Sequence, residues 1–302
     1  MPFLWYNIFV MKVCVKNNDI LIQEVTDFKL SDTFDCGQVF RFNPDGNGGY
    51  IGTAYKKTVR ITQNGNTLTL HSTSEADFEN VWRNFLDLDR DYGKIKAELT
   101  KDSDTVMESA IDFGGGIRIL KQDLWETIVS FIISASNNIP RIKKIIELLC
   151  SNFGTEHIYE GRTYYSFPDA KTIASLKPEE LDVIKAGYRT KYILQTAKQI
   201  ANGEFSLDAL YNMNTAEAKT ELLKLCGVGN KVADCITLFA LNRFDSFPVD
   251  VWIKRIMEYC YFENETQDIP IISQFASDKF GELGGIAQQY LFYYARSLKI
   301  GT

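Results

Sequence analysis

The sequence predicts an α+β protein in which an N-terminal antiparallel β-sheet domain is followed by an all-helical domain. Short apolar or alternating runs separated by turn residues dominate the first 110 residues, a pattern typical of strands. Beyond about residue 90, apolar side chains recur at helical spacing. We place the domain boundary at residue 114, so that residues 1–114 form the strand domain and residues 115–302 form the helical domain.

The strand domain begins with apolar runs at residues 13–15, 20–22 and 39–42, and we expect each of them to be a strand. A hairpin is indicated further on, because residues 59–62 and 67–70 flank Asn64-Gly65, a pair that favours two-residue turns. Ser74 begins a helix that we expect to reach about residue 86. Asp77 gives it only a weak capping box, because aspartate reaches back less well than glutamate.

The helical domain is predicted from apolar stripes that recur every three or four residues. In the first of its helices the stripe consists of Leu124, Ile128, Phe131 and Ile132. We expect helices at residues 122–136, 139–153, 178–186, 191–201, 215–225, 231–240, 251–261 and 285–298. The longest loop is expected at residues 154–167.

The composition is that of an ordinary globular protein, with 302 residues of which 45% are hydrophobic and 24% charged. The formal net charge of −6 argues against a strongly basic nucleic-acid-binding surface. It does not exclude DNA binding, because the charge of one local face matters more than the sum. Basic residues do gather in part of the helical domain, although each alone also fits a solvated helix face: Arg141, Lys143, Lys144, Lys185, Arg189, Lys191 and Lys198.

Cysteine and histidine usage argues against a disulfide framework and a metal centre. The two histidines are too few for a histidine-ligated metal. Scattered cysteines without a C-x-x-C pair are typical of a reduced intracellular protein, so we expect a cytoplasmic location and no secretion. The six cysteines are Cys14, Cys36, Cys150, Cys226, Cys235 and Cys260.

Residues 1–12 are largely apolar, but they lack a basic leading segment and are too short to span a bilayer. No other stretch approaches the roughly 18 apolar residues that a membrane-spanning helix needs. We therefore expect no membrane association. Met11 opens a more ordinary strand, so we consider either Met1 or Met11 as the true start.

The most informative segment is LCGVGNKVADCITLFALNRFDSFPVDVW, from Leu225 to Trp252. Gly227-Val228-Gly229 allows a tight turn that other residues resist, and a helix is predicted directly after it. A helix N-terminus offers unpaired N–H groups and the positive end of the helix dipole, so this turn can hold a DNA phosphate. Such a contact requires no basic side chain and reads no base sequence.

Lys231 and Asp250 are the candidate catalytic residues of this segment. At a helix N-terminus the dipole disfavours the ammonium form of Lys231 by roughly 0.3–1 kcal/mol, and a lysine nucleophile needs a neutral amine. Asp250 precedes a predicted helix, where it can both cap the helix and stabilise a developing sugar cation. A solvated lysine and a plain N-cap aspartate remain the alternatives.

These residues resemble the helix-hairpin-helix (HhH-GPD) DNA glycosylases, and among them the 8-oxoguanine DNA glycosylase/AP lyases. The resemblance extends from about residue 20 to residue 300. It implies a TBP-like N-terminal sheet, a helix-hairpin-helix glycosylase domain with a catalytic cleft, and a monomer that acts on damaged double-stranded DNA. Five further stretches carry it: residues 34–42 (FDCGQVFRF), 115–123 (GGIRILKQD), 131–141 (FIISASNNIPR), 187–189 (GYR) and 286–292 (IAQQYLF).

The resemblance also implies roles in catalysis and base recognition. Lys231 would be the nucleophile that forms a Schiff base, with Asp250 as its carboxylate partner. Gly37 would accept, through its carbonyl, the ring N–H that oxidised guanine has and guanine lacks. The remaining contacts to the base would come from Gln288 on the Watson–Crick edge and from Cys235 and Phe292 on the two faces.

DNA contacts and a cation site are implied in the same way. The expected DNA-binding residues are Asn137, Asn138, Arg141, Tyr188, Arg189, Gly227, Val228 and Gly229. The carbonyls of Leu223, Leu225 and Val228 match a possible site for a monovalent or divalent cation. No cofactor is expected to be required, and the cysteine spacing argues against the iron–sulfur cluster that endonuclease III relatives carry.

The expected reaction is removal of 8-oxoguanine, preferably opposite cytosine, followed by strand nicking through β-elimination. Two residues depart from the family pattern: Ser136 replaces a third asparagine, and Trp252 replaces a histidine that many relatives have. Two alternatives stay open. A glycosylase of the same fold for another damaged base is one, although Lys231 weighs against the alkyl-base enzymes. A non-catalytic helix-hairpin-helix DNA-binding protein is the other, and it would need neither Lys231 nor Asp250.

Overall fold

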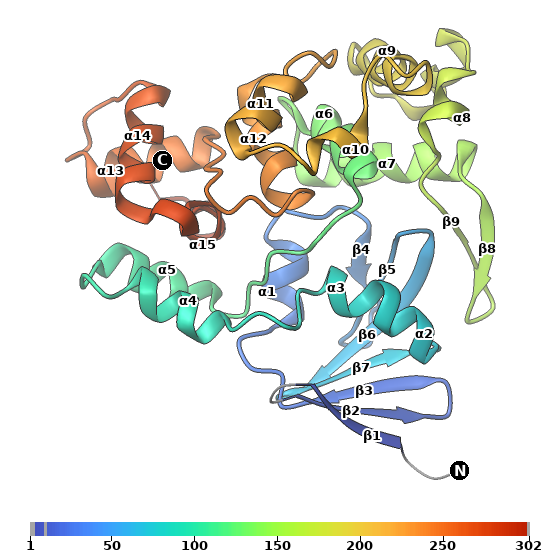
Figure 1. Cartoon of the computed structure of the whole chain (residues 1–302), viewed down its shortest axis with the longest axis horizontal. Coiled ribbons are helices and arrows are strands. Elements are labelled where there is room, and N and C mark those ends of the chain that lie inside the picture. The colour runs from blue at the N-terminus through green and yellow to red at the C-terminus, as the bar shows by residue number, and fades with distance from the viewer. Residues whose placement is uncertain (1–3, 9–10, 301–302) are drawn as a thin grey trace.

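The computed structural model describes residues 4–8 and 11–300, and it consists of a sheet-containing N-terminal part below a larger helical part (Figure 1). The predicted α+β class is therefore confirmed. The sheet is antiparallel throughout, in the order β1-β2-β3-β7-β6-β5-β4. Its strands are β1 Leu4–Ile8, β2 Met11–Lys16, β3 Asp19–Gln23, β4 Phe42–Pro44, β5 Tyr50–Ala54, β6 Lys57–Asn64 and β7 Thr67–His71.

Alternation along the strands explains why they form one sheet with a single buried face. Ile20 and Ile22 on β3 lie opposite Leu70 and Leu68 on β7, and all four side chains are fully buried. Because side chains alternate between the two faces of a strand, this register places the apolar residues together against the core.

The helix expected at residues 74–86 is present as three consecutive pieces. These are α2 Glu75–Asp77, a π-helical turn η1 Phe78–Trp82 and α3 Arg83–Phe85. The Ser74 side chain accepts a hydrogen bond of 3.0 Å from the Asp77 amide, so the predicted cap is confirmed. Phe78, Trp82 and Phe85 pack into the hydrophobic core between these pieces and the sheet.

Two local predictions in the strand domain are wrong in detail. Residues 39–42 do not form a strand, and only Phe42 belongs to β4. Val39 and Phe40 are both buried but belong to different hydrophobic cores, so this segment crosses between the cores instead of pairing in the sheet. The predicted hairpin exists, but its turn is Gly65-Asn66, because Asn64 pairs with Thr67.

The segment expected to be the longest loop is instead a hairpin of β8 Glu156–Tyr159 and β9 Arg162–Tyr165. It reaches from the helical part to the sheet, as Figure 1 shows. The Tyr159 hydroxyl accepts from the Arg60 amide at 2.9 Å and donates to the His71 carbonyl at 2.6 Å. These contacts to the sheet stabilise a hairpin whose strands have little apolar alternation of their own.

Every helix expected in the helical part is present, with ends that differ by up to three residues. Several further helices were not predicted, among them the one-turn helices α8 and α10. Besides α2, η1 and α3, the helices of the described residues are α1 Leu30–Asp35, α4 Tyr92–Leu99, α5 Thr105–Gly114, α6 Leu124–Ser134, α7 Ile139–Phe153, α8 Ala170–Ala174, η2 Pro178–Ile184, α9 Arg189–Ala201, α10 Leu207–Leu210, α11 Thr215–Leu222, α12 Asn230–Phe239, α13 Val251–Tyr261, α14 Ile269–Phe280, η3 Gly281–Leu283 and α15 Gly284–Leu298.

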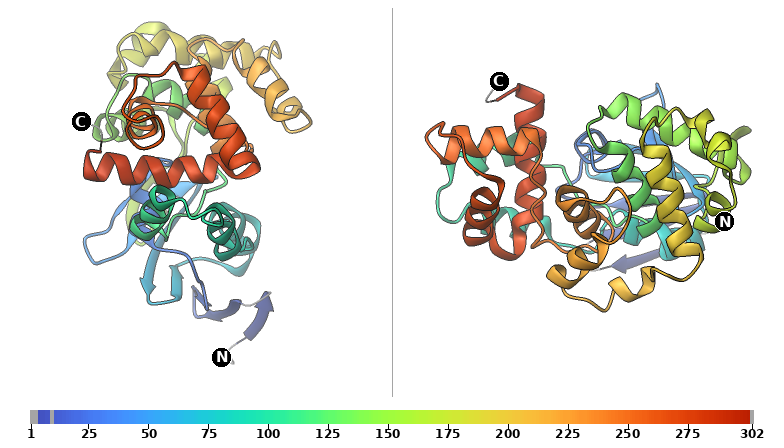
Figure 2. Two further views of the ribbon diagram at one scale, coloured as in Figure 1. Left: turned by 90° about the vertical axis from the view of Figure 1, so that its left-hand side faces the viewer. Right: turned by 90° about the horizontal axis from the view of Figure 1, so that it is seen from above.

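Two hydrophobic cores underlie the two parts. The smaller core lies between the sheet and α1 to α3, and the larger lies among the other helices. Helix α5 lies against α15, and the left-hand view of Figure 2 shows α15 above α4 and α5. The buried side chains of α4 and α5 belong to the larger core. The division at residue 114 therefore stays a prediction and does not coincide with the boundary between the cores. No helix of the described residues is both long enough and apolar enough to cross a bilayer.

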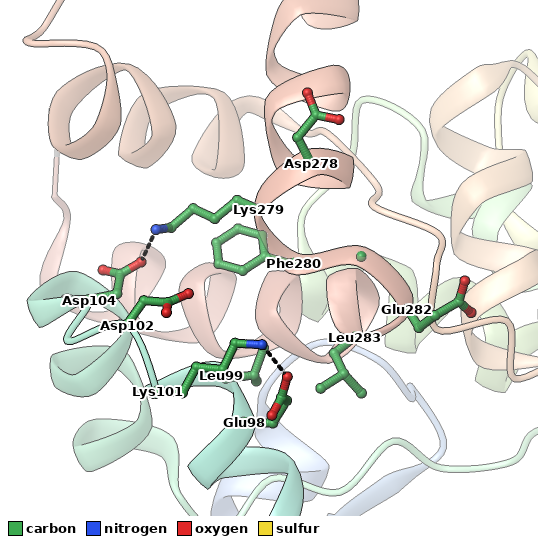
Figure 3. A pocket seen from close by; sticks show the side chains of 11 residues that line it. Glu98, Leu99, Lys101, Asp102, Asp104, Asp278, Lys279, Phe280, Glu282 and Leu283 are labelled. Carbon is green, nitrogen blue, oxygen red and sulfur yellow. Dashed lines mark hydrogen bonds and ion pairs between the residues drawn. The ribbon is translucent and has the colours of Figure 1, made fainter.

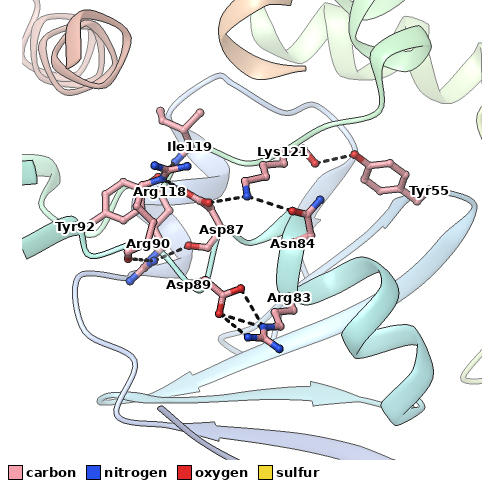
Figure 4. Close-up of polar contacts among 10 residues, drawn as sticks. All are labelled: Tyr55, Arg83, Asn84, Asp87, Asp89, Arg90, Tyr92, Arg118, Ile119 and Lys121. Atoms are coloured by element: carbon pink, nitrogen blue, oxygen red, sulfur yellow. Dashed lines mark hydrogen bonds and ion pairs between the residues drawn. The ribbon is translucent and has the colours of Figure 1, made fainter. Parts of the chain in front are cut away.

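A buried polar cluster joins the segment after α3 to the connection that leads into α6 (Figure 4). The Asp87 carboxylate is almost fully buried. It forms ion pairs with Arg90 at 2.6 Å and Lys121 at 3.2 Å and accepts a hydrogen bond from the Tyr92 hydroxyl at 3.0 Å. Arg118 donates to the Asp87 carbonyl at 2.7 Å. Buried charged groups are tolerated when they are paired and hydrogen-bonded in this way, so the cluster stabilises the junction between the two parts.

Candidate active site

A cavity of about 40 Å³ lies where the two parts of the fold meet. Its walls come from the loop after α1, from α6, α12 and α15, and from the segment before α13. Six of the predicted residues line it together: Gly37, Lys231, Cys235, Asp250, Gln288 and Phe292. Four further lining residues were not predicted: Phe131, Phe239, Pro248 and Gln289.

The glycine hairpin positions Lys231 at the start of α12. Gly227 has a φ of +85°, and a Cβ there would lie 2.7 Å from the Cβ of Tyr192, so both backbone conformation and space require glycine. Gly229 is the N-cap of α12, and a Cβ added there would meet no atom within 4 Å. The turn therefore leaves open space at the end of the helix where an anion binds best.

Lys231 is half-buried, and its ammonium or amine group lies over an aromatic ring. Its Nζ is 5.3 Å from the ring centroid of Phe131. Phe131 in turn stacks on Phe239, with centroids 5.4 Å apart and an angle of 13° between the rings. These two rings form an apolar floor that restricts the side chain of Lys231 to the cavity.

Asp250 caps α13, as the sequence predicted. Its Oδ1 accepts from the amides of Trp252 at 3.0 Å and Ile253 at 2.9 Å. Burial raises the pKa of the carboxyl group, although the Ile253 amide and the charge of Lys231 oppose that rise. Because Lys231 acts on this carboxylate electrostatically and both line one cavity, the pair is placed to act on one bound sugar.

The opposite wall carries the groups expected to face a base. Gly37 has a φ of +90°, and a Cβ there would lie 2.9 Å from Nη1 of Arg296 and 3.2 Å from Cε1 of Phe292. Gln288 is 95% buried, yet its Oε1 has no hydrogen-bond partner among the described residues. A buried polar atom without a partner is costly, so this oxygen is suited to a ligand that donates a hydrogen bond.

Cys235 contributes an uncharged thiol to the cavity. Burial raises the pKa of the thiol to about 11, although Lys231 opposes the rise. At neutral pH the side chain is therefore a small apolar surface, which suits stacking better than nucleophilic attack.

The expected DNA-contacting side chains differ in exposure, and most of them lie on the surface. Tyr188 and Arg141 are exposed. Asn138 caps α7 by accepting from the Arg141 amide at 3.0 Å, and the Asn137 side chain donates to the Ile133 carbonyl at 3.1 Å. Asn137 and Asn138 thus fix the loop from which Arg141 extends.

The side chain of Arg189, in contrast, is buried and already hydrogen-bonded within the protein. It is 96% buried, it donates to the carbonyls of Ala135 and Ser136, and its Cζ is 4.3 Å from the ring centroid of Tyr188. Ser136 has a φ of +49°, a conformation that is strained for a residue other than glycine. In this conformation Arg189 supports the loop and the aromatic ring, and a direct contact to a base would require these hydrogen bonds to break.

The carbonyls suggested for a cation follow α11. The Leu225 carbonyl accepts from the Val228 amide at 3.2 Å, which leaves one lone pair for an ion. Side-chain metal ligands do not gather elsewhere: the described residues contain no group of three or more histidine, cysteine, aspartate or glutamate side chains that could hold a metal.

A larger cavity of about 470 Å³ lies between the segment joining α4 to α5 and the end of α14 (Figure 3). Its walls carry five carboxylates, and Asp104 pairs with Lys279 at 3.0 Å. An excess of acidic groups repels DNA phosphates, so the smaller cavity with Lys231 is the better candidate for chemistry on DNA.

Comparison with known families agrees with this geometry. A model of the HhH-GPD superfamily base excision DNA repair proteins matches residues 129–279, and a model of the 8-oxoguanine DNA glycosylase N-terminal domain matches residues 20–128. Fold and site thus define a base-excision DNA repair protein of the HhH-GPD superfamily. More narrowly, the chain belongs to the 8-oxoguanine DNA glycosylase family, the N-glycosylase/DNA lyases.

Individual relatives cover most of the chain. The N-glycosylase/DNA lyase OGG1 of Arabidopsis thaliana is 30% identical over 285 residues, which are 88% of this chain and 77% of that protein. A probable N-glycosylase/DNA lyase of Methanothermobacter thermautotrophicus is 30% identical over 64% of this chain and 68% of its own length. The 8-oxoguanine glycosylase/lyase of Clostridium acetobutylicum, solved with double-stranded DNA containing cytosine opposite 8-oxoguanine, is 41% identical with a TM-score of 0.92 over 96% of this chain and 99% of that chain.

Proposed function

We propose that this chain is a bifunctional DNA glycosylase/AP lyase that removes 8-oxoguanine from duplex DNA and then nicks the strand. The observation that carries the proposal is the single cavity in which Lys231 and Asp250 face Gln288 and Gly37. A lysine beside a carboxylate suits attack on a sugar carbon, and an unpaired amide oxygen suits recognition of a base edge. The family relationship supports the same reaction.

The chemical step requires Lys231 in its neutral form. Its Nζ attacks C1′ of the damaged nucleotide, the N–C1′ bond forms and the C1′–N9 bond breaks. The electron pair of the broken bond leaves with the base, which then takes up a proton. Asp250, held by its two amide donors, stabilises the positive charge that develops on the sugar.

Strand nicking follows from the same covalent intermediate. The nitrogen bonded to C1′ loses one proton, its electron pair forms the C=N bond, and the C1′–O4′ bond breaks as O4′ takes up a proton. The product is a protonated Schiff base between Nζ and C1′ of the opened sugar. Removal of a proton from C2′ then expels the 3′ phosphate by β-elimination. A glycosylase without a nucleophilic amine would stop at the abasic site, so nicking depends on Lys231.

Base recognition combines attraction with repulsion. The Gly37 carbonyl accepts the N7–H of 8-oxoguanine but faces a lone pair on N7 of guanine, so it rejects the undamaged base. The base must first leave the duplex stack. The cavity is far smaller than the roughly 300–1,000 Å³ of typical ligand sites, so we infer that Phe292, which is only half-buried, moves when the base enters.

Selection of cytosine opposite the lesion is assigned to Arg141, whose exposed guanidinium is free to form the bidentate base contacts that arginine favours. Tyr188 would insert into the duplex, with Arg189, Asn137 and Asn138 supporting that surface. The hairpin Gly227-Val228-Gly229 would bind a backbone phosphate without reading sequence.

The remaining expectations are part of the same proposal. The enzyme would act inside the cell as a monomer on damaged double-stranded DNA, and it would require no cofactor. The carbonyls of Leu223, Leu225 and Val228 would hold a cation that stabilises the hairpin. No chemical step depends on that ion, because Lys231 and Asp250 supply the reacting and stabilising groups.

An excision assay tests the proposal. Duplexes with 8-oxoguanine, 3-methyladenine or guanine at one position are incubated with the enzyme and analysed with and without alkaline cleavage. We expect nicking at 8-oxoguanine without alkali and no product from the other two duplexes. Excision of 3-methyladenine alone would instead favour a glycosylase of the same fold for another damaged base. Binding without any cleavage would favour a non-catalytic DNA-binding protein.

A further inference from the structure

Arg296 lies one helical turn beyond Phe292 on α15 and is fixed from several sides. Its Nη2 donates to the carbonyl of Asp35, the last residue of α1, at 2.5 Å. Its Cζ is 5.1 Å from the ring centroid of Phe292 and 5.8 Å from that of Tyr293. These contacts hold the planar guanidinium in one orientation beside the segment from Asp35 to Gly37.

The other terminal nitrogen of this guanidinium has no partner. Nη1 of Arg296 is buried and makes no hydrogen bond among the described residues. A Cβ on Gly37 would lie only 2.9 Å from Nη1, so this donor lies directly against the backbone of a residue that lines the cavity. A buried charged donor without an acceptor is costly, which is typical of a position completed by a ligand.

The charge of Arg296 also reaches the catalytic carboxylate. Burial raises the pKa of Asp250, and Arg296 is among the charges that oppose the rise. Arg296 is therefore close enough to act on negative charge that develops within the cavity. The guanidinium thus lies against the Asp35–Gly37 segment, and its charge acts on Asp250.

We propose that Arg296 contacts the substrate base: its Nη1 donates to a carbonyl oxygen that flanks the N7–H of the oxidised purine. This inference rests on the proposed function. The oxidised edge carries N7–H between two carbonyl oxygens, so a donor beside Gly37 is placed to meet an acceptor next to the N–H that Gly37 would bind. When the C1′–N9 bond breaks, the electron pair passes to the base, and Arg296 stabilises that negative charge until the base takes up a proton.

The contact belongs to base removal and not to strand nicking at an abasic site, which has no base. Replacing Arg296 by Gln keeps a neutral donor that can reach the Asp35 carbonyl. Replacing it by Lys keeps the positive charge. A role through charge therefore predicts that Arg296→Lys retains more activity than Arg296→Gln, whereas simple anchoring of the Asp35 segment predicts equal activity.

The test is single-turnover excision of 8-oxoguanine opposite cytosine, measured beside nicking of a preformed abasic site. For Arg296→Gln we expect excision to slow by about 10- to 100-fold, the range of a charge-assisted hydrogen bond. Abasic-site nicking should slow much less, because that reaction loses only the effect of the Arg296 charge on Asp250 and no contact to a base. The excision rate of Arg296→Lys should lie between those of Arg296→Gln and the wild type.

Two outcomes would overturn the inference while leaving the proposed function intact: excision by Arg296→Gln at the wild-type rate, or equal losses in both reactions. A wild-type enzyme that nicks abasic DNA but removes no 8-oxoguanine would instead refute the proposed function. If both variants unfold, free 8-oxoguanine base added to the wild type decides the matter. Protection of Arg296 from phenylglyoxal by the free base supports the contact, and unchanged modification contradicts it.

Discussion

Substitution of Gly37 by alanine tests the recognition wall directly. The residue has a φ of +90°, and the added Cβ would lie 2.9 Å from Arg296 Nη1, 3.2 Å from Phe292 Cε1 and 3.3 Å from Ile139 Cδ1. A residue held in such a backbone conformation costs about 1–3 kcal/mol. The three short contacts add to that cost, because the side chains must move away from the cavity wall.

The expected outcome of Gly37→Ala is a selective loss. If the strain moves the carbonyl away from the base, the same 1–3 kcal/mol corresponds to a roughly 5- to 150-fold slower excision of 8-oxoguanine. Nicking of a preformed abasic site should be nearly unchanged, because that substrate has no base for Gly37 to bind. Urea denaturation should show a lower free energy of unfolding.

Gly203→Ala is the matched control. Gly203 also has a positive φ, of +77°, but a Cβ there would meet no atom within 4 Å, and the residue lies outside the cavity. We expect a loss of stability from the backbone strain alone, smaller than that of Gly37→Ala, without a selective loss of excision. The reasoning fails if Gly37→Ala removes 8-oxoguanine as fast as the wild type, or if both variants lose excision equally.

Three further substitutions address the carboxylate, the base edge and the opposite base. Asp250→Asn should slow excision and nicking together. In the wild type, burial raises the pKa of Asp250, so as the pH falls the carboxylate is protonated, and activity is lost, at a higher pH than for an ordinary aspartate. A pH–rate profile that shows no such loss on the acid side would contradict the role of Asp250. Gln288→Leu removes the unpaired Oε1 and should weaken binding of 8-oxoguanine duplexes by about 1–3 kcal/mol, measured by fluorescence anisotropy against an abasic-site duplex whose affinity should not change. Arg141→Ala should relax the preference for cytosine opposite the lesion by roughly 1–3 kcal/mol, and excision measured opposite all four bases would refute the assignment if the preference were unchanged.

Local signals in the sequence predicted much of the helical part. The cap formed by Asp250 is encoded within three residues of the helix it begins, so pattern and chemistry agree there. The glycine hairpin is also encoded locally, because its tight turn requires a positive φ at Gly227, which glycine adopts without strain. The position of Lys231 in the first turn of α12 could be predicted because it lies two residues after Gly229.

Contacts over long sequence separations could not be obtained from periodicity. Gly37 and Gln288 lie about 250 residues apart, and only the family resemblance suggested that they share a wall. Phe131 and Phe239 have the spacing of core residues, and nothing local distinguishes a cavity floor from a core. The partners of Arg189 and Arg296 are backbone carbonyls that lie far away in the sequence, and side-chain patterns do not reveal them.

Segments stabilised by the other part of the fold were also mispredicted. Residues 39–42 cross between two cores, so their apolar run has no strand register. The hairpin of β8 and β9 depends on Tyr159 binding the sheet, a tertiary contact that overrides weak local propensity.

The most direct test of the central claim is borohydride trapping with the wild type and Lys231→Gln on duplexes that carry 8-oxoguanine opposite each of the four bases. Borohydride reduces a Schiff base to a stable covalent adduct, so the adduct reports attack by the amine on the sugar. We predict an adduct for the wild type, strongest opposite cytosine, and none for Lys231→Gln. An adduct of equal yield in Lys231→Gln would contradict the assignment of Lys231, and no adduct from a wild type that binds the duplex tightly would contradict the lyase mechanism.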